Sequence, residues 1–388
     1  MTGRSWRGVG AVAVWQVVAS STYYGIFAAT AGVRTSFAVS RYQIGILLAV
    51  LTLGYTLFLF PAGAVVDAYG DRPTMVVGLL LLAVGAGTVA MAPSYEVLLL
   101  AVFVLGAAYA SAMPATNRAI AARAPKGRYN LAIGTKQVGV TLGSAIAAVV
   151  VTNVSRVGRT WQAGFVGLAV VAGVVGIGYL LAYRGTGGSG TPTLPDVRGL
   201  RSNRTYVLLT ATGFFVGTAI FTTTGYMVPY VEESGASVQT AGFALALMQL
   251  SGSAGRVGVG ELADRLPGSA ARSAFRVMFV QLATAGALFV ALPLAGVTVT
   301  FGLAVVLGVS LLGVTGLYHG TLVRMVAEDE AGAATAGGQT MINLGGLVAP
   351  PAFGLAADAL GYPVGWRLVA VASVLGAVFL ALALRSLE

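Results

Sequence analysis

The sequence predicts an all-α membrane protein with twelve transmembrane helices in two six-helix bundles. Of its 388 residues, 57% are hydrophobic and only 9% are charged, which is too few charges to cover a soluble protein of this length. Twelve apolar runs are each long enough for the roughly 20 helical residues that cross a bilayer. The two halves of the chain also share short motifs at a nearly constant spacing, which indicates a duplicated six-helix unit.

The twelve apolar runs follow one another with short polar or glycine-containing connections. They lie at residues 9–31, 43–66, 73–92, 97–117, 130–153, 161–183, 205–230, 238–262, 274–294, 297–318, 332–357 and 364–385. The first run is too long for the core of a signal peptide, so we expect it to be retained as a span. The segment 185–204 starts with a Gly/Ser/Pro-rich stretch that cannot bury a core, which predicts a flexible cytoplasmic linker. This linker divides an N-terminal bundle, 1–184, from a C-terminal bundle, 205–388.

The basic residues are distributed unevenly between the two sides of this topology. Most of them lie on the side of Arg4 and Arg7. Because Lys and Arg concentrate in cytoplasmic loops, we expect both termini in the cytoplasm and the protein in the plasma membrane. The net charge of +10 then reflects orientation in the lipid bilayer, and no nucleic acid partner is expected. The sequence has no cysteine, which excludes thiolate metal sites, and we expect no metal or cofactor.

Three short motifs of the first half recur about 200 residues later. The pairs are Thr22 and Gly25 with Thr222 and Gly225, Gly63 and Asp67 with Gly260 and Asp264, and Gln137, Leu142 and Gly143 with Gln339, Leu344 and Gly345. Because six spans return the chain to its starting side, the two copies have the same orientation. We therefore expect the bundles to be related by a pseudo-two-fold axis along the membrane normal.

The turn after the second run carries a family signature. It resembles G-x-L-x-D-R-x-G-R-R, the signature of the major facilitator superfamily of transporters, with matches at Gly63, Asp67, Gly70 and Arg72. The turn departs from this pattern at Ala68 and Asp71, where basic residues are usual. The chain is similar to this superfamily over essentially its whole length.

The matching turn of the second half retains Gly260, Leu262, Asp264 and Arg265. The resemblance implies transport by rocking of one half against the other, with a cytoplasmic gate at the two turns. It assigns the gating role to Asp67, Arg72, Asp264 and Arg265. In relatives the aspartate meets the N-terminus of a helix from the other half, where a carboxylate is favoured.

Arg256 is the most informative charged residue, because it lies inside the eighth run. It precedes Asp264 by about two turns, which places it roughly 12 Å from the cytoplasmic end. An arginine at this depth faces a water-filled cavity, a counter-ion or backbone carbonyls. Gly252 and Gly260 share its stripe and would let a neighbouring helix approach.

The pattern Arg256-x-x-x-Gly260 is also similar to the eighth helix of the monocarboxylate transporters and the oxalate/formate antiporters. That resemblance implies that Arg256 binds a carboxylate. In the animal carriers an aspartate precedes this arginine by four residues. Gly252 stands there in this chain, so their proton relay is not implied.

Lys136 lies in the fifth run, and its stem could alternatively extend to the headgroups. The resemblance implies that Lys136 and Arg256 approach one crevice from opposite halves. All acidic residues fall at helix ends or in loops, so the simplest counter-ion for this pair is the substrate. Further substrate-binding candidates, each equally suited to ordinary packing, are Gln137, Tyr24, Thr222, Tyr226, Gln249 and Asn343. His319, the only histidine, is a candidate for proton coupling or is simply hydrated.

The sequence therefore favours a secondary active transporter of a small organic anion, of carboxylate type, that works by alternating access. Proton symport and anion exchange both remain open. The alternative is a proton-coupled exporter of hydrophobic or cationic compounds, which would favour an acid buried among the first spans. An enzyme is not expected, because the chain has no catalytic motif in a suitable context. A non-transporting receptor of the same superfamily is a further alternative. We expect a monomer whose partners are the small anionic substrate and the lipid.

Overall fold

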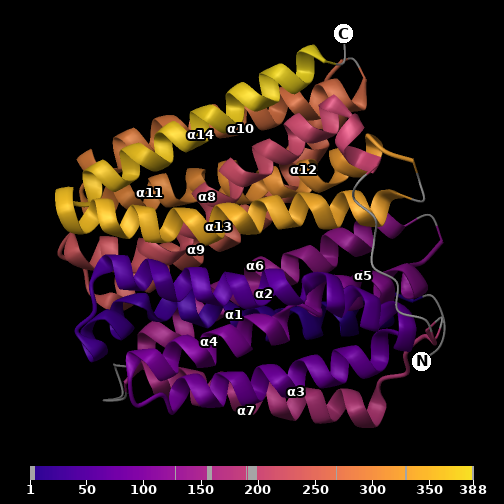
Figure 1. Cartoon of the computed structure of the whole chain (residues 1–388), viewed down its shortest axis with the longest axis horizontal. Helices are drawn as coiled ribbons and strands as arrows, with labels where there is room; N and C mark the ends of the chain where they lie inside the picture. Colours follow the sequence, from indigo (N-terminus) through magenta and orange to yellow (C-terminus); the bar gives the residue numbers. More distant parts are fainter. Residues whose placement is uncertain are drawn as a thin grey trace. The chain divides into compact units, whose positions relative to one another are not determined.

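The computed structural model describes residues 5–126, 128–154, 160–188, 190, 199–267, 269–327 and 330–386, and it is all-α over these residues. The chain divides into two compact units (Figure 1). The first comprises Met1–Phe37 and Val50–Leu194, and the second comprises Ala38–Ala49 and Pro195–Glu388. The boundary at 194/195 falls inside the segment predicted as the linker.

The first unit contains the helices of the first six predicted spans. They are α1 (Trp6–Phe37), α2 (Arg41–Tyr69), α3 (Asp71–Ala90), α4 (Tyr95–Tyr109), α5 (Ala112–Arg123), α6 (Tyr129–Asn153) and α7 (Trp161–Ala182). The predicted fourth span consists of α4 and α5, with a break at Ala110 and Ser111. The break has a local cause, because Pro114 has no N–H for the carbonyl of Ala110. Helix α2 is shared, since its first residues belong to the second unit.

The second unit contains the helices of the last six predicted spans. They are α8 (Arg204–Glu233), α9 (Val238–Arg265), α10 (Ala270–Ala291), α11 (Val297–Leu307), α12 (Gly313–Arg324), α13 (Ala331–Leu360) and α14 (Tyr362–Arg385), with short helical turns at η2 (Gly199–Ser202) and η3 (Leu292–Leu294). A π-helical turn, η4 (Gly308–Leu312), joins α11 to α12 within the predicted tenth span. Only the π-turn interrupts that span, which was predicted as one helix.

Among the described residues, 11 helices are long and apolar enough to cross a membrane. Helix α9 is not one of them, although it is 28 residues long. Its hydropathy is lowered by glycines and serines and by Arg256, Glu261 and Asp264. The helix predicted as the eighth span is therefore present, but it is more polar than the helices of the other spans.

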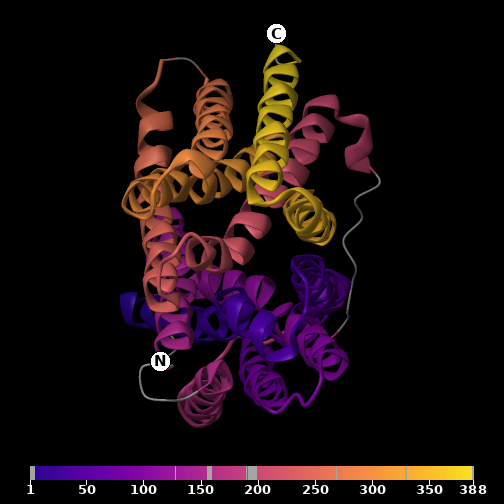
Figure 2. The same cartoon turned by 90° about the vertical axis from the view of Figure 1, so that its left-hand side faces the viewer.

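Glycines bring the helices of the first unit into close contact. A Cβ atom on Gly106 of α4 would lie 2.0 Å from the carbonyl oxygen of Leu51 in α2, and one on Gly143 of α6 would lie 2.4 Å from that of Val17 in α1. Such small residues allow helix backbones to approach within a membrane. Several helices of this unit are seen nearly end-on in Figure 2.

Replacement of Gly106 by leucine is expected to destabilise the first unit by about 2 kcal/mol or more, because the side chain would overlap the backbone of α2. Gly178 of α7 provides the matched control, since no described atom lies within 4 Å of a Cβ built there. Thermal unfolding of both leucine variants in detergent measures the difference. Equal melting temperatures would show that the α2–α4 contact is not tight.

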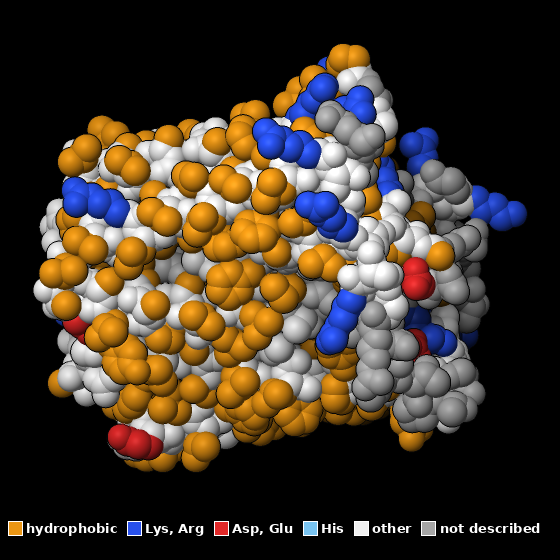
Figure 3. All heavy atoms as spheres, turned by 45° about the horizontal axis from the view of Figure 1, so that its top comes forward, with side chains coloured by type: hydrophobic (Ala, Val, Ile, Leu, Met, Phe, Trp, Pro, Cys, Tyr) orange, Lys and Arg blue, Asp and Glu red, His pale blue; other side chains and the backbone are white. Residues whose placement is uncertain are grey.

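The exposed side chains of the long helices are largely apolar. On α14, Val371, Val374 and Val378 are 57%, 51% and 46% exposed. Figure 3 shows a broad face covered by hydrophobic side chains, with Lys and Arg gathered toward one end. A surface of this kind is typical of helices that face lipid and is costly in water.

Candidate functional site

Arg256 lies on α9 beside the π-turn η4, and both elements belong to the second unit. Its half-buried guanidinium donates from Nε to the carbonyl oxygen of Leu312 at 3.1 Å. Glycines make this approach possible: a Cβ on Gly252 would lie 2.6 Å from the Leu312 side chain, and one on Gly255 would lie 2.8 Å from Cα of Val309.

Of the two glycines predicted to allow a close approach beside Arg256, only Gly252 does so. A Cβ atom on Gly260 would have no described atom within 4 Å, so the prediction of a close approach there is wrong. The close contact follows Gly252 and Gly255, which lie against Leu312 and Val309 of η4.

The π-turn itself accepts side-chain donors from two directions. The N–H of Gly313 bonds to the carbonyl of Gly308, five residues earlier, which is the wide register of a π-helix. Gln281 of α10 donates from Nε2 to the carbonyl of Val309 at 3.0 Å. Thr315 donates to Leu312 at 2.7 Å, the carbonyl that also accepts from Arg256. No motif in the sequence marks a π-turn, so Gln281 and Thr315 were missed.

His319 lies one turn beyond Thr315 on α12. Its Nδ1 is 2.9 Å from the carbonyl oxygen of Thr315, and its ring packs edge-on against Tyr318. The histidine is therefore close in sequence and structure to the segment that contacts Arg256. This placement is compatible with a role in coupling, which stays a prediction.

Lys136 is buried among the helices of the first unit. Its side chain is 1% exposed, and Nζ donates to Oδ1 of Asn117 on α5 at 2.9 Å. The alternative in which the stem extends to the surface does not describe this structure. Asn117 was missed, because an asparagine next to Arg118 near a helix end gives no distinctive pattern. Gln137, the neighbouring candidate on α6, is half-buried.

A buried polar network includes Thr116, the residue that precedes Asn117 on α5. Gln16 of α1 donates from Nε2 to Ser20 at 3.0 Å and to the hydroxyl of Tyr109 at 3.3 Å. Its Oε1 accepts from Thr116 at 3.2 Å. The network thus connects α1, α4 and α5 through groups that can bond hydroxyls.

Four tyrosines cluster beside this network. The ring of Tyr23 stacks on Tyr109 with centroids 4.2 Å apart, and the rings of Tyr24 and Tyr55 pack edge-on against Tyr23 at 5.0 and 6.0 Å. The predicted candidate Tyr24 is therefore part of an aromatic cluster built by α1, α2 and α4.

The candidates of the second unit are spread more widely. Thr222, Gln249 and Asn343 are all at most 2% exposed, and Gln249 lies about two turns from Arg256 on α9. Asn343 accepts from Gln339 at 2.9 Å through Oδ1. The hydroxyl of Tyr226 lies 2.6 Å from the carbonyl oxygen of Arg41 and 3.0 Å from that of Pro350, and its single proton is shared between these backbone acceptors.

Charged residues hold the start of α2 within the second unit. Asp358 of α13 accepts from the backbone N–H groups of Arg41 and Tyr42 at 3.1 and 2.8 Å. The guanidinium of Arg41 also pairs with Glu233 at 2.5 Å. A carboxylate that accepts from the first amides of a helix is favoured by the helix dipole.

The predicted gating residues make contacts within their own units. Asp67 pairs with Arg118 at 3.3 Å, and Arg118 donates to the carbonyl of Gly187 at 2.6 Å. Arg72 donates to the carbonyl of Leu180. In the second unit, Arg265 pairs with Glu261 at 2.5 Å, and Asp264 is exposed.

Asp71, a departure from the family signature, is a fully buried anchor. Its Oδ2 pairs with Nη1 of Arg123 at 2.7 Å and accepts from the hydroxyl of Tyr183 at 2.8 Å. Its Oδ1 accepts from the backbone N–H and hydroxyl of Thr186 at 2.5 and 3.0 Å. Arg123 also donates to the carbonyl of Arg184 and lies 4.5 Å from the ring centroid of Tyr183.

The segment that Asp71 holds, residues 185–190, is here called the strap; its residue 189 lies outside the described residues. A Cβ on Gly185 would lie 2.3 Å from Cβ of Arg72, and one on Gly188 would lie 2.1 Å from the carbonyl oxygen of Ala68. The N–H of Gly190 donates to that same carbonyl at 2.9 Å. The start of the predicted flexible linker is therefore packed on the first unit, because its glycines fit against the α2–α3 turn. Residues 191–198 lie outside the described residues.

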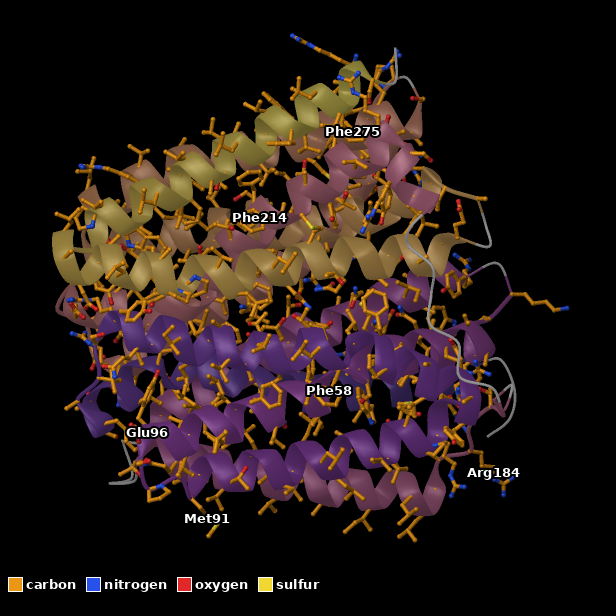
Figure 4. All side chains as sticks on the ribbon, in the orientation of Figure 1. Phe58, Met91, Glu96, Arg184, Phe214 and Phe275 are labelled. Atoms are coloured by element: carbon orange, nitrogen blue, oxygen red, sulfur yellow. The ribbon has the colours of Figure 1, made fainter. Side chains whose placement is uncertain are left out.

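Figure 4 shows how this anchor is placed along the first unit. Arg184, at the end of α7, lies at one end of the bundle, whereas Met91 and Glu96 lie at the other end. Asp71, the strap and the signature turn thus belong to a single end of the unit, which matches the side predicted to carry most basic loops.

Helices with lipid-type surfaces, buried polar clusters and a signature turn together define a membrane transporter rather than an enzyme. The model of the Major Facilitator Superfamily matches residues 12–336, so the chain belongs to this superfamily. The chain is 27% identical over 335 residues to an uncharacterised transporter of the same type from Mycobacterium tuberculosis, covering 84% of this chain and 74% of that protein.

Two hexuronate transporters are also similar to this chain. The one from Bacillus subtilis is 23% identical over 353 residues, covering 85% of this chain and 82% of that protein. The one from Escherichia coli is 26% identical over 182 residues, covering 47% of this chain and 42% of that protein. Among solved structures, an inward-facing, unoccupied bacterial homologue of the human lysosomal transporter Spinster has a TM-score of 0.83 at 17% identity, covering 98% of this chain and 97% of that one. A nucleoside transporter has a TM-score of 0.78 at 13% identity, covering 97% of this chain and 99% of that one.

Proposed function

We propose that this superfamily member is a secondary active transporter of a small organic anion, and that its substrate is a hydroxylated carboxylate of the hexuronate type. The observation that carries the proposal is the chemistry of two cations within the spans. Lys136 donates to an amide oxygen of Asn117, and Arg256 donates to the carbonyl of Leu312. The acceptors in these two hydrogen bonds are neutral oxygens. A carboxylate substrate would form charge-assisted hydrogen bonds with these groups, which are stronger than bonds to neutral acceptors.

The first unit supports the hydroxylated part of this substrate class. The network of Gln16, Ser20, Tyr109 and Thr116 contains donors and acceptors for hydroxyl groups. The adjoining tyrosine rings offer apolar faces for a sugar ring, and binding sites commonly combine apolar walls with a few polar groups. Similarity to hexuronate transporters points in the same direction.

The remaining features of the proposal concern mechanism and location. Transport proceeds by alternating access, as proton symport or anion exchange, with Asp67, Arg72, Asp264 and Arg265 at the cytoplasmic gate. The protein lies in the plasma membrane with both termini in the cytoplasm, as the distribution of basic residues favours.

Counterflow in proteoliposomes tests the proposal directly. Vesicles loaded with unlabelled D-glucuronate should accumulate labelled D-glucuronate from outside, whereas vesicles loaded with D-glucose should not. An acidic exterior should accelerate net uptake into empty vesicles for a proton symporter and leave one-for-one exchange unchanged. Accumulation driven by glucose or by a hydrophobic cation, with no response to any carboxylate, would contradict the proposed substrate class.

A further inference from the structure

We propose that the π-turn Gly308–Leu312 positions Arg256 for a carboxylate, and that Gln281 of α10 is the positioning residue that holds this turn. The inference rests on the proposed function, since it concerns the same anion. It adds Gln281, which no sequence pattern marked, and gives a functional reason for the π-turn within the tenth span.

A π-turn is an uncommon element in a helix, and such turns occur frequently at functional sites. In a regular α-helix each carbonyl is directed at the N–H four residues later. The wider register of η4 lets its carbonyls accept from neighbouring helices as well. Val309 accepts from Gln281 on one side, and Leu312 accepts from Arg256 on the other. The turn thus links α10 to α9 through two short side-chain contacts.

The bond from Arg256 to Leu312 sets the direction of the guanidinium. This group is a planar fork with five N–H donors, so holding Nε–H on one carbonyl limits the directions in which the other four donors can face. A carboxylate bound end-on is recognised by the two Nη groups and does not compete for Nε. The position of the Leu312 carbonyl therefore determines where a bound carboxylate is held.

Gln281 determines the position of the turn from the opposite side. Its side chain is 6% exposed, and a Cβ on Gly313 would lie 2.9 Å from its Nε2, so glycine at that position leaves room for the amide. Its Oε1 is buried and has no hydrogen-bond partner among the described residues. A half-satisfied buried amide costs stability, and an apolar side chain would pack at lower cost. The useful property of Gln281 is therefore its donor to Val309.

The test compares a carboxylate with its neutral analogue. Affinities for D-glucuronate and D-glucuronamide are measured by calorimetry on purified wild type and on Gln281→Leu, which keeps the volume and removes the donor. We expect the preference of wild type for glucuronate over glucuronamide to fall about tenfold in the variant, because the fork is no longer aligned with the carboxylate. Glucuronamide affinity should change little.

A matched control and a second variant separate positioning from general damage. Ser273 is buried on the same helix and donates to Leu266, outside the π-turn, so Ser273→Ala should leave the preference unchanged. Gly313→Ala retains Gln281 but crowds its amide, and it should reproduce the loss even where Gln281→Leu folds poorly. In the Arg256→Gln background, Gln281→Leu should have no further effect on the preference.

Each contrary outcome has a distinct meaning. Equal losses for both ligands, persisting in the Arg256→Gln background, would show that Gln281 is structural and overturn this inference alone. An unchanged preference in both Gln281→Leu and Gly313→Ala would do the same. A wild type that binds glucuronamide as tightly as glucuronate would contradict the proposed function itself, together with the inference.

Discussion

Replacement of Asp71 by alanine is expected to lower the free energy of unfolding of the first unit by about 3 kcal/mol or more. The carboxylate is 0% exposed and pairs with Arg123, which is itself only 7% exposed. Its removal leaves a buried guanidinium without its counter-charge and releases Tyr183 and Thr186 from their acceptor. Thermal unfolding in detergent measures the loss, and limited proteolysis of the strap should become faster.

Asp67, the other aspartate of the signature turn, provides the control for this experiment. The side chain of Asp67 is 56% exposed in its pair with Arg118, so Asp67→Ala should change stability by less than about 1 kcal/mol. Combining Asp71→Leu with Arg123→Met should restore much of the lost stability, because it removes both buried charges. Equal melting temperatures for Asp71→Ala and Asp67→Ala would show that Asp71 is not an anchor.

Replacement of Arg256 by glutamine is expected to weaken D-glucuronate binding about tenfold or more, since a charge-assisted hydrogen bond is lost from the site. Arg256→Lys should restore only part of the affinity, because an ammonium group cannot reproduce the planar fork. Arg276 of α10 is exposed and has no role in the proposed site or gate, so Arg276→Gln should leave affinity unchanged. Calorimetry on the four proteins measures these differences.

Lys136→Gln extends this experiment to the first unit. We expect Lys136→Gln to weaken D-glucuronate binding more mildly than Arg256→Gln does. Calorimetry on both single variants and the double variant measures whether the two losses are coupled. Strictly additive losses would place the residues in separate sites. Losses below about 0.5 kcal/mol for each single variant would remove both residues from the binding site.

Sequence reasoning was strongest where the membrane dictates the pattern. A lipid environment requires long apolar helices, so the twelve spans were recognisable as apolar runs, and Arg256 stood out within the eighth of them. The signature turn was identified from only a few residues, since glycine and aspartate at fixed spacing are distinctive.

Contacts between distant segments were beyond the reach of such patterns. Asp71 looked like a departure from the signature because its partners, Arg123, Tyr183 and Thr186, come from later parts of the chain. The π-turn has no sequence code, so Gln281 and Thr315 went unnoticed. Asn117 is an ordinary helix residue until the fold places Lys136 next to it.

The strap also changes the length of the tether that joins the two units. With Gly190 bonded to Ala68, only residues 191–198 separate the strap from the turn that starts at Gly199. A chain segment of this length spans at most about 30 Å when fully extended, compared with about 50 Å for a tether that began at Gly185. In every conformation of a transport cycle that keeps the strap in place, these two attachment points must stay within the shorter distance. Release of the strap from both Asp71 and Ala68 would lengthen the tether and widen the range of separations that the units can reach.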